Sequence, residues 1–184
     1  MKSTLRPIGL VFALLLAGAA SAAENQYLFI KGQKSGVIKG GVVVKGQEGA
    51  ILVDSLSHEI SSPRDVATGM PSGKRQHKPL VLTVRVDKSW PLLYNALVTN
   101  ENLTQVELRV LVPNANGTGA AAAVQRKVLL TNANISDIKQ YTVDAANGSA
   151  NYDVLQISLT YQKIEWDWIE GGISAMDDWE APVQ

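Results

Sequence analysis

The sequence predicts a mainly β fold, a small β-barrel of two packed antiparallel sheets with one α-helix at about residues 90–99 packed outside. Two observations lead to this class. Most apolar residues recur with a period of two, which is typical of strands that have one dry and one wet face. Only one segment shows the spacing of an amphipathic helix. A chain of 184 residues with 46% hydrophobic content is enough for one domain with its own core.

The strongest strand prediction covers residues 152–166. Leu155, Ile157 and Leu159 fall on one face, while Gln156 and Ser158 fall on the other. Residues 105–112 alternate in the same way, and residues 50–60 alternate imperfectly. Three glycines flank Val42–Val44 and indicate a β-rich turn region. Further strands are expected at residues 27–31, 79–86, 124–130 and 135–141.

The single helix is predicted from five apolar residues at spacings of three, four and seven: Trp90, Leu93, Tyr94, Leu97 and Val98. Ser89 precedes them as a candidate N-cap. Pro91 falls in the first turn, where a missing backbone N–H is tolerated. A helix ending near Asn100 is therefore expected.

The first 22 residues have the pattern of a secretory signal peptide. Lys2 and Arg6 supply positive charge, and residues 8–20 are apolar. Ala20 and Ala22 supply small residues at the positions that a signal peptidase reads. The apolar run is shorter than the roughly 20 residues of a spanning helix. We therefore expect residues 1–22 to be a cleaved signal peptide and residues 23–184 to be the folded domain, with no membrane contact once the leader is removed.

Composition argues against several classes of site. The chain has no cysteine, so it has neither a disulfide nor a thiolate metal site. Its two histidines, His58 and His77, match no metal-ligand spacing, and we expect no metal and no cofactor. Basic and acidic residues balance at 17 each, which predicts no nucleic-acid partner. No nucleophile–base pattern is found, because Ser57, His58 and Glu59 are adjacent in sequence and would face opposite sides of a strand. The chain is therefore not expected to be an enzyme.

Six acidic residues lie among three tryptophans near the C-terminus, between residues 165 and 180. One interpretation is a carboxylate site for calcium or a glycan. The other is a solvated tail with aromatic anchors. The ligand spacing of a calcium loop is missing, which favours the tail.

Residues 61–78 form the most informative predicted loop. They are polar, rich in proline and glycine, and carry four basic residues. Loops longer than about 12–15 residues are uncommon unless they make functional contacts or are disordered. Residues 114–123 are rich in glycine, alanine and asparagine, and are predicted to be a hairpin tip.

Three ordered blocks then point to a family. Residues 68–97, TGMPSGKRQHKPLVLTVRVDKSWPLLYNAL, resemble the signature region of the haemolysin-coregulated protein (Hcp) family. Residues 156–168, QISLTYQKIEWDW, are similar to its last long strand, and DDWEAP at 177–182 to its C-terminal end. The resemblance covers about residues 27–182.

The resemblance implies a structural role in type VI secretion. Family members form homohexameric rings that stack into the inner tube of a contractile apparatus, with spike, sheath and effector proteins as partners, and they are themselves secreted. By resemblance, the loop 61–78 would contact other subunits or stacked rings. The contact candidates are Arg64, Ser72, Lys74, Arg75, His77 and Lys78. Candidates for the wall of the lumen, where effectors are carried, are Ser55, Ser57 and His58.

The leader leaves an alternative open. Family tubes assemble in the cytoplasm, whereas a working signal peptide would send this chain through the periplasm. The alternative function is a separately exported periplasmic or extracellular paralogue that acts as a binding module outside a tube. If the leader does not function, cytoplasmic assembly followed by secretion is expected.

Overall fold

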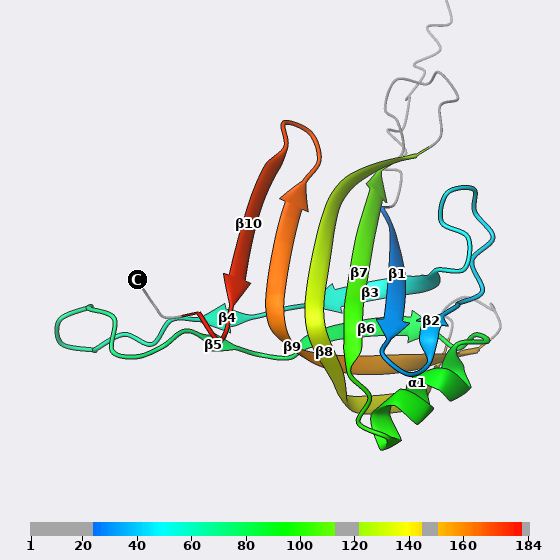
Figure 1. Cartoon of the computed structure of the whole chain (residues 1–184), viewed down its shortest axis with the longest axis horizontal. Helices are drawn as coiled ribbons and strands as arrows, with labels where there is room; N and C mark the ends of the chain where they lie inside the picture. Colours follow the sequence, from blue (N-terminus) through cyan, green and yellow to red (C-terminus); the bar gives the residue numbers. More distant parts are fainter. Residues whose placement is uncertain (1–23, 113–121, 145–150, 182–184) are drawn as a thin grey trace, which may run out of the picture.

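The computed structural model describes residues 24–112, 122–144 and 151–181. The predicted signal peptide at residues 1–22 and most of the predicted hairpin tip at 114–123 lie outside these ranges. Six strands close into a barrel in the order β9-β6-β3-β1-β7-β8, and β8 pairs again with β9 (Figure 1). These strands are β1 (Asn25–Gly32), β3 (Ile51–Ser57), β6 (Leu80–Arg85), β7 (Leu103–Val112), β8 (Ala123–Val143) and β9 (Tyr152–Trp168).

The prediction of a mainly β barrel with one short helix is confirmed, but its division into two packed sheets is not matched. One continuous antiparallel sheet closes on itself, because each of the six strands pairs with a neighbour on both sides. Closure removes the free edges that two separate sheets would expose. A short strand, β2 (Gly36–Ile38), adds to β1.

β8 replaces two predicted strands with one. It runs through both segments, 124–130 and 135–141, without a break. Asn132 adopts a left-handed backbone conformation, with φ of 50°, and the register with β9 shifts between Ile135 and Asp137. Such irregularities bend a strand without ending it. The sequence shows a gap in the alternation at this point, and the structure shows a curve.

β9 changes partner halfway along its length. Its residues 154–159 pair with β6, whereas residues 163–168 pair with β10 (Ile173–Asp178). The prediction of a solvated C-terminal tail is therefore wrong for residues 173–178, which form a strand. The strand has no buried apolar face that could give a sequence signal, since Ile173, Ser174, Ala175 and Met176 are all exposed. The first half of β9 is therefore paired with β6 within the barrel, and its second half is paired with β10.

A bulge in β3 explains why the apolar alternation of residues 50–60 is imperfect. Ile51 and Val53 are buried, and the register with β6 then shifts between Val53 and Ser55. After this irregularity Leu56 packs against the core, while Ser55 and Ser57 are exposed. A bulge thus moves the apolar side chains from odd to even positions.

The helix α1 (Trp90–Val98) agrees with its prediction in position, but only part of its predicted buried face is buried, because Trp90 and Val98 are exposed. Leu93 and Ala96 are fully buried in the same core as the barrel strands, and Pro91 lies in the first turn. Ser89 makes no side-chain capping bond; its hydroxyl donates instead to Oδ1 of Asp87 at 2.5 Å. Ser89 itself has helical backbone angles, whereas a capping serine is usually extended.

Glu101 ties the β1–β2 turn to the end of this helix. It is only 3% exposed, and its Oε1 accepts the backbone N–H groups of Lys34 and Ser35, both at 2.7 Å. These bonds, with Ser35 first, lower its pKa even though burial opposes the shift. A Cβ on Gly32 would collide with this carboxylate, so glycine is required there by close approach. Within the described ranges, no helix has the length and hydropathy needed to cross a bilayer.

Candidate functional site: the arm and its root

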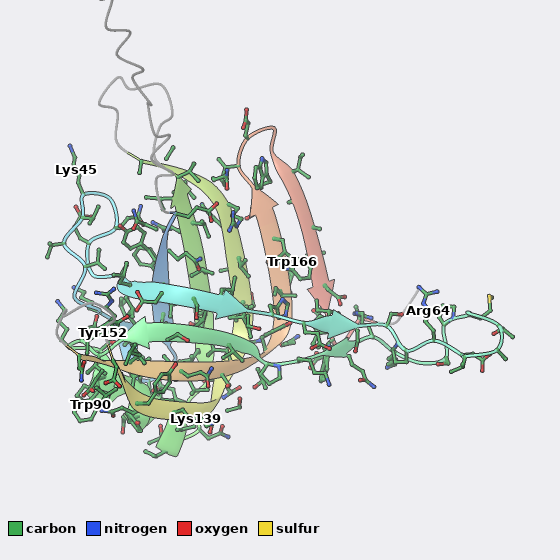
Figure 2. The ribbon with its side chains drawn as sticks, turned by 180° about the vertical axis from the view of Figure 1, so that it is seen from behind. Lys45, Arg64, Trp90, Lys139, Tyr152 and Trp166 are labelled. Carbon is green, nitrogen blue, oxygen red and sulfur yellow. The ribbon has the colours of Figure 1, made fainter. Side chains whose placement is uncertain are left out.

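Residues 59–78, here called the arm, form a hairpin that projects from the barrel (Figures 1 and 2). β4 (Ile60–Ser61) pairs with β5 (Gln76–His77), and a bridge joins Arg64 to Pro71 further out. The backbone N–H of Ser72 donates to the carbonyl of Pro63 at 3.0 Å. The segment predicted as a long loop is therefore a narrow, partly paired ribbon, and its outer part has no barrel residues beside it.

The tip of the arm is organised by local bonds around Asp65. Its Oδ1 accepts the backbone N–H of Thr68 at 2.8 Å and the Thr68 hydroxyl at 2.7 Å, and these bonds lower the pKa of Asp65. Gly69 follows with a φ of +70°, a conformation that favours glycine. The turn leaves Val66 fully exposed and Met70 largely exposed. An ordered tip with apolar side chains in solvent is suited to contact with another molecule.

The basic contact candidates on the arm fall into two groups. Arg64, Lys74 and Lys78 are exposed, and among the described residues no carboxylate lies within 4.0 Å of them. Ser72 is exposed beside them. Arg75 is different, because its guanidinium turns back toward β10 and pairs with Asp177. The outer group is free to meet a partner, whereas Arg75 attaches the arm to the barrel.

The root of the arm is a chain of five polar side chains: His58, Tyr161, His77, Asp177 and Arg75. The Tyr161 hydroxyl lies 2.6 Å from Nε2 of His58 and 2.8 Å from Nδ1 of His77. On its other side, His77 Nε2 lies 2.7 Å from Oδ2 of Asp177. Arg75 donates its Nε–H to the same carboxylate and an Nη2–H to the carbonyl of Asp178 at 2.6 Å. One hydroxyl on β9 therefore holds both strands of the arm where they leave the barrel.

Aromatic rings enclose this chain. Trp179 meets His77 edge-on with ring centres 5.8 Å apart, and Trp166 lies 6.4 Å from His58. Burial raises the pKa of Tyr161 to about 12, with a further contribution from the nearby charge of Asp177. Burial and the charge of His77 lower the pKa of His58. Burial opposes ionisation of Asp177, but the hydrogen bonds from Arg75 and His77 prevail and lower its pKa.

The order Tyr161–His77–Asp177 has the outline of a nucleophile, a base and an orienting acid. A tyrosine with a pKa raised to about 12 is a poor nucleophile at neutral pH, and this hydroxyl is already hydrogen-bonded to a histidine on each side. The geometry therefore positions the arm rather than a substrate. Across the part of the chain that the structure describes, no three histidine or carboxylate side chains are grouped to hold a metal ion.

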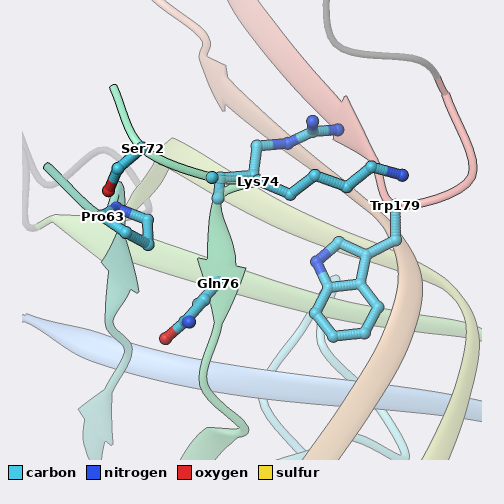
Figure 3. A pocket seen from close by; sticks show the side chains of 7 residues that line it. Pro63, Ser72, Lys74, Gln76 and Trp179 are labelled. Atoms are coloured by element: carbon cyan, nitrogen blue, oxygen red, sulfur yellow. The ribbon is translucent and has the colours of Figure 1, made fainter. Parts of the chain in front are cut away.

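A shallow cleft of roughly 580 Å³ lies between the arm and the C-terminal strand (Figure 3). Pro63 and Ser72 line one side, Gln76 lies at the centre, and the indole of Trp179 forms the other side. Lys74 extends over this cleft. It is an open feature of the arm surface, with both a cation and a half-exposed ring available for contact.

The structure brings together only some of the predicted site residues. His58, Arg75 and His77 meet in the root, whereas Arg64, Ser72, Lys74 and Lys78 are spread along the arm. Ser55 and Ser57 lie on the exposed side of β3, away from the barrel core. Sequence reasoning missed Tyr161 and Asp177, which lie 84 and 100 residues from His77. Their only sequence signal is their place in the two C-terminal blocks of the family resemblance.

The structure is thus a small, closed β-barrel that carries a projecting arm braced at its root. The family model for "Type VI secretion system effector, Hcp" matches residues 27–168. The Major exported protein of Pseudomonas aeruginosa is 36% identical over 172 residues, which covers 88% of this chain and 98% of that protein. The chain therefore belongs to the Hcp family of type VI secretion proteins.

Solved structures agree with this membership. A crystal structure titled Hcp protein superposes with a TM-score of 0.77 at 31% identity and covers 87% of this chain and all of that chain. The secreted protein Hcp3 from Pseudomonas aeruginosa gives 0.70 at 31% identity, covering 86% and 100% of the two chains. A mutant form of the Hcp1 protein from the E. coli EAEC 042 pathovar gives a TM-score of 0.73 at 29% identity, covering 85% and 99% of the two chains.

Proposed function

We propose that this protein is a structural, ring-forming subunit of the type VI secretion inner tube, that it is itself secreted, and that its ring carries effectors in the lumen. The observation that carries the proposal is the match of the Hcp family model to residues 27–168, which spans the barrel, the arm and β9. The rigid closed sheet supports it, because a tube wall needs subunits of constant shape.

The arm is the proposed contact element between subunits or stacked rings. Its exposed cations, Arg64, Lys74 and Lys78, need an acidic surface, and β9 and β10 offer one. Glu170 is exposed in the turn between these strands, Glu180 is exposed just after β10, and Asp178 is half-buried at the end of β10. Opposite charges on two parts of the same chain favour head-to-tail association of copies, which produces rings and stacks.

The ring is proposed to be a homohexamer, with spike, sheath and effector proteins of the type VI apparatus as further partners. Ser55 and Ser57 remain candidates for the wall of its lumen. They support that role by being small, polar and exposed on a strand that is fixed on both sides. A polar wall of this kind would let a cargo protein pass without strong adhesion.

Light scattering with sedimentation of the purified protein tests the ring. We expect a mass of several copies, and we expect charge reversal in Lys74→Glu to weaken association. The matched control is Lys139→Glu, which makes the same change at an exposed position on β8, far from the arm (Figure 2). A single-chain mass at every concentration would contradict the proposal, as would equal weakening by the two variants.

The leader-like residues 1–22 favour a second function, that of a separately exported paralogue acting as a periplasmic or extracellular binding module. Mapping the N-terminus of the protein from the cell separates the two. An intact N-terminus, with the protein found in the cytoplasm and then in the medium, supports the tube. Cleavage near residue 22, with secretion independent of the type VI apparatus, supports the module.

A further inference from the structure

We propose that the root of the arm is a proton-operated lock, which keeps the arm fixed while its two histidines carry one extra proton or none and releases it when both are charged. The inference rests on the proposed function, because it makes the arm's contact with other copies depend on pH. The evidence for it is the order of the hydrogen bonds from His58 through Tyr161 and His77 to Asp177, and the number of hydrogens that these bonds can hold.

The first step is the direction of the hydrogen bonds. A carboxylate only accepts, so His77 must donate its Nε2–H to Asp177, which also receives Arg75. In neutral His77 the other nitrogen, Nδ1, is then an acceptor, and the Tyr161 hydroxyl donates to it. The oxygen of Tyr161 in turn accepts Nε2–H from His58. With no extra proton, every group in the chain has a partner.

The second step is the addition of one proton. If His77 becomes an imidazolium, its Nδ1–H donates to Tyr161, and Asp177 balances the charge. The Tyr161 hydroxyl turns and donates to His58, which changes to the tautomer with Nε2 free. The chain reverses its direction and keeps all its bonds, so the lock stays closed.

The third step is the second proton. With both rings charged, His58 and His77 each present an N–H to the same oxygen, and the hydrogen of Tyr161 loses both of its acceptors. Two cations then face one hydroxyl in a place where the His77 side chain is only 4% exposed. Burying like charges and an unpaired hydroxyl is costly, and separation of the groups relieves it.

Charged and titratable groups reach the two rings from β9, from β10 and from the arm. Tyr161 approaches from β9, Asp177 and Asp178 from β10, and Arg75 from the arm itself. The sequence neighbours Glu59 and Lys78 are exposed to water. Asp177 can neutralise one imidazolium, at His77, but it is shared with Arg75 and makes no contact with His58. No carboxylate among the described residues pairs with His58.

Release would move the arm because both of its strands depend on Tyr161. His58 precedes β4, and His77 lies in β5. Without the hydroxyl bridge, the two strands are joined at this end by the ladder between Ile60 and His77 and by the bond from the N–H of Lys78 to the carbonyl of Glu59. These bonds open more often once the root no longer braces them. These bonds lie within the arm, and Arg75 still joins the arm to β10, so the release frees the arm from β9 while leaving it attached to the C-terminal strand.

Hydrogen exchange and nuclear magnetic resonance test the lock on the purified protein at about pH 7.5 and about pH 5, the range in which histidine titrates. Because the backbone bonds at this end of the arm open more often once Tyr161 no longer braces them, we expect protection of the Lys78 amide and its neighbours to fall about tenfold in acid, relative to the β1–β7 ladder. The chain has only two histidines, so ring signals of the wild type show directly when the second one charges. His58→Gln, which cannot take the second proton, should keep its protection and its association in acid.

The outcomes separate the lock from the tube. Unchanged root protection in the wild type after both histidines have charged would overturn the lock, and so would a His58→Gln variant with the wild-type pH dependence. Amide protection and histidine ring signals are both properties of an individual chain, so neither measurement depends on association. If the protein never associates while the root still opens in acid, the tube proposal fails and the lock stands.

Discussion

His77 Nε2 lies 2.7 Å from Asp177 Oδ2, although 100 residues separate the two in sequence. This contact joins the inner end of the arm to the last strand of the fold. Because β10 pairs only with β9 among the described strands, the arm and the C-terminal strand each help to fix the other.

Asp177→Asn should destabilise the protein by about 1–2 kcal/mol at neutral pH, because it removes the charged acceptor that Arg75 and His77 share. The folded-state pKa of Asp177 is lowered, so its contribution is present above its ordinary pKa and is lost as the pH falls through the folded value. Urea unfolding at a series of pH values measures both effects. Asp137→Asn, on an exposed part of β8, is the control and should change stability by less than about 0.5 kcal/mol.

Tyr161→Phe should alter stability at high pH. The pKa of Tyr161 is raised to about 12, so between pH 10 and 12 the unfolded chain loses this proton first and stability falls as the pH rises. The phenylalanine variant should lose that part of the alkaline slope, and at neutral pH it should be less stable by about 1–2 kcal/mol. Tyr141→Phe, at an exposed position, is the matched control. Equal alkaline slopes for wild type and Tyr161→Phe would contradict the assigned environment.

Glu101→Gln should cost about 1–3 kcal/mol, since a neutral amide replaces a buried carboxylate that accepts two backbone N–H groups. Its lowered pKa means that the stabilisation is complete above the ordinary value of 4.5 and disappears in acid. Thermal unfolding at neutral pH and at about pH 3 measures this difference. The variant should be distinguishable from wild type at neutral pH and much less so in acid.

Ile157→Ala tests the barrel core. Ile157 is fully buried and lies opposite Leu82 on one side and Ile138 on the other. Truncation should cost about 2–5 kcal/mol. Ile173→Ala makes the same change on β10, where the side chain is 67% exposed, and should cost under about 1 kcal/mol. Denaturant midpoints with unchanged slopes would support this ranking, whereas similar losses would argue against the position of β10.

The parts of the fold with local periodicity were predictable. The helix at residues 90–98 and the strand at 152–166 are strongly periodic, and both are present where they were expected. The sequence divides β8 in two because Asn132 and the following bulge interrupt the alternation while the pairing continues. The sequence of β10 favours a tail because an exposed strand needs no apolar face. Its existence depends on β9 offering a free edge.

The candidate site was predictable only in part. The length of the arm, its prolines and glycines, and its basic residues mark it as an unusual segment, and its role as a contact element stays a prediction that the family resemblance implies. The root was not predictable, because Tyr161 and Asp177 have no local pattern that links them to His58 and His77. A histidine's partners are set by how the barrel closes, and neither composition nor spacing carries that information.

The continuous pairing of β8 has a mechanical consequence. β8 is bonded to β7 on one side and β9 on the other over much of its length, so a pull along it loads many hydrogen bonds in shear at once. β10 has one neighbour among the described strands, and its ladder can open from its end, one bond after another. Under tension the barrel should therefore hold its shape while the C-terminal hairpin peels away first, a sequence of ruptures that single-molecule stretching would resolve.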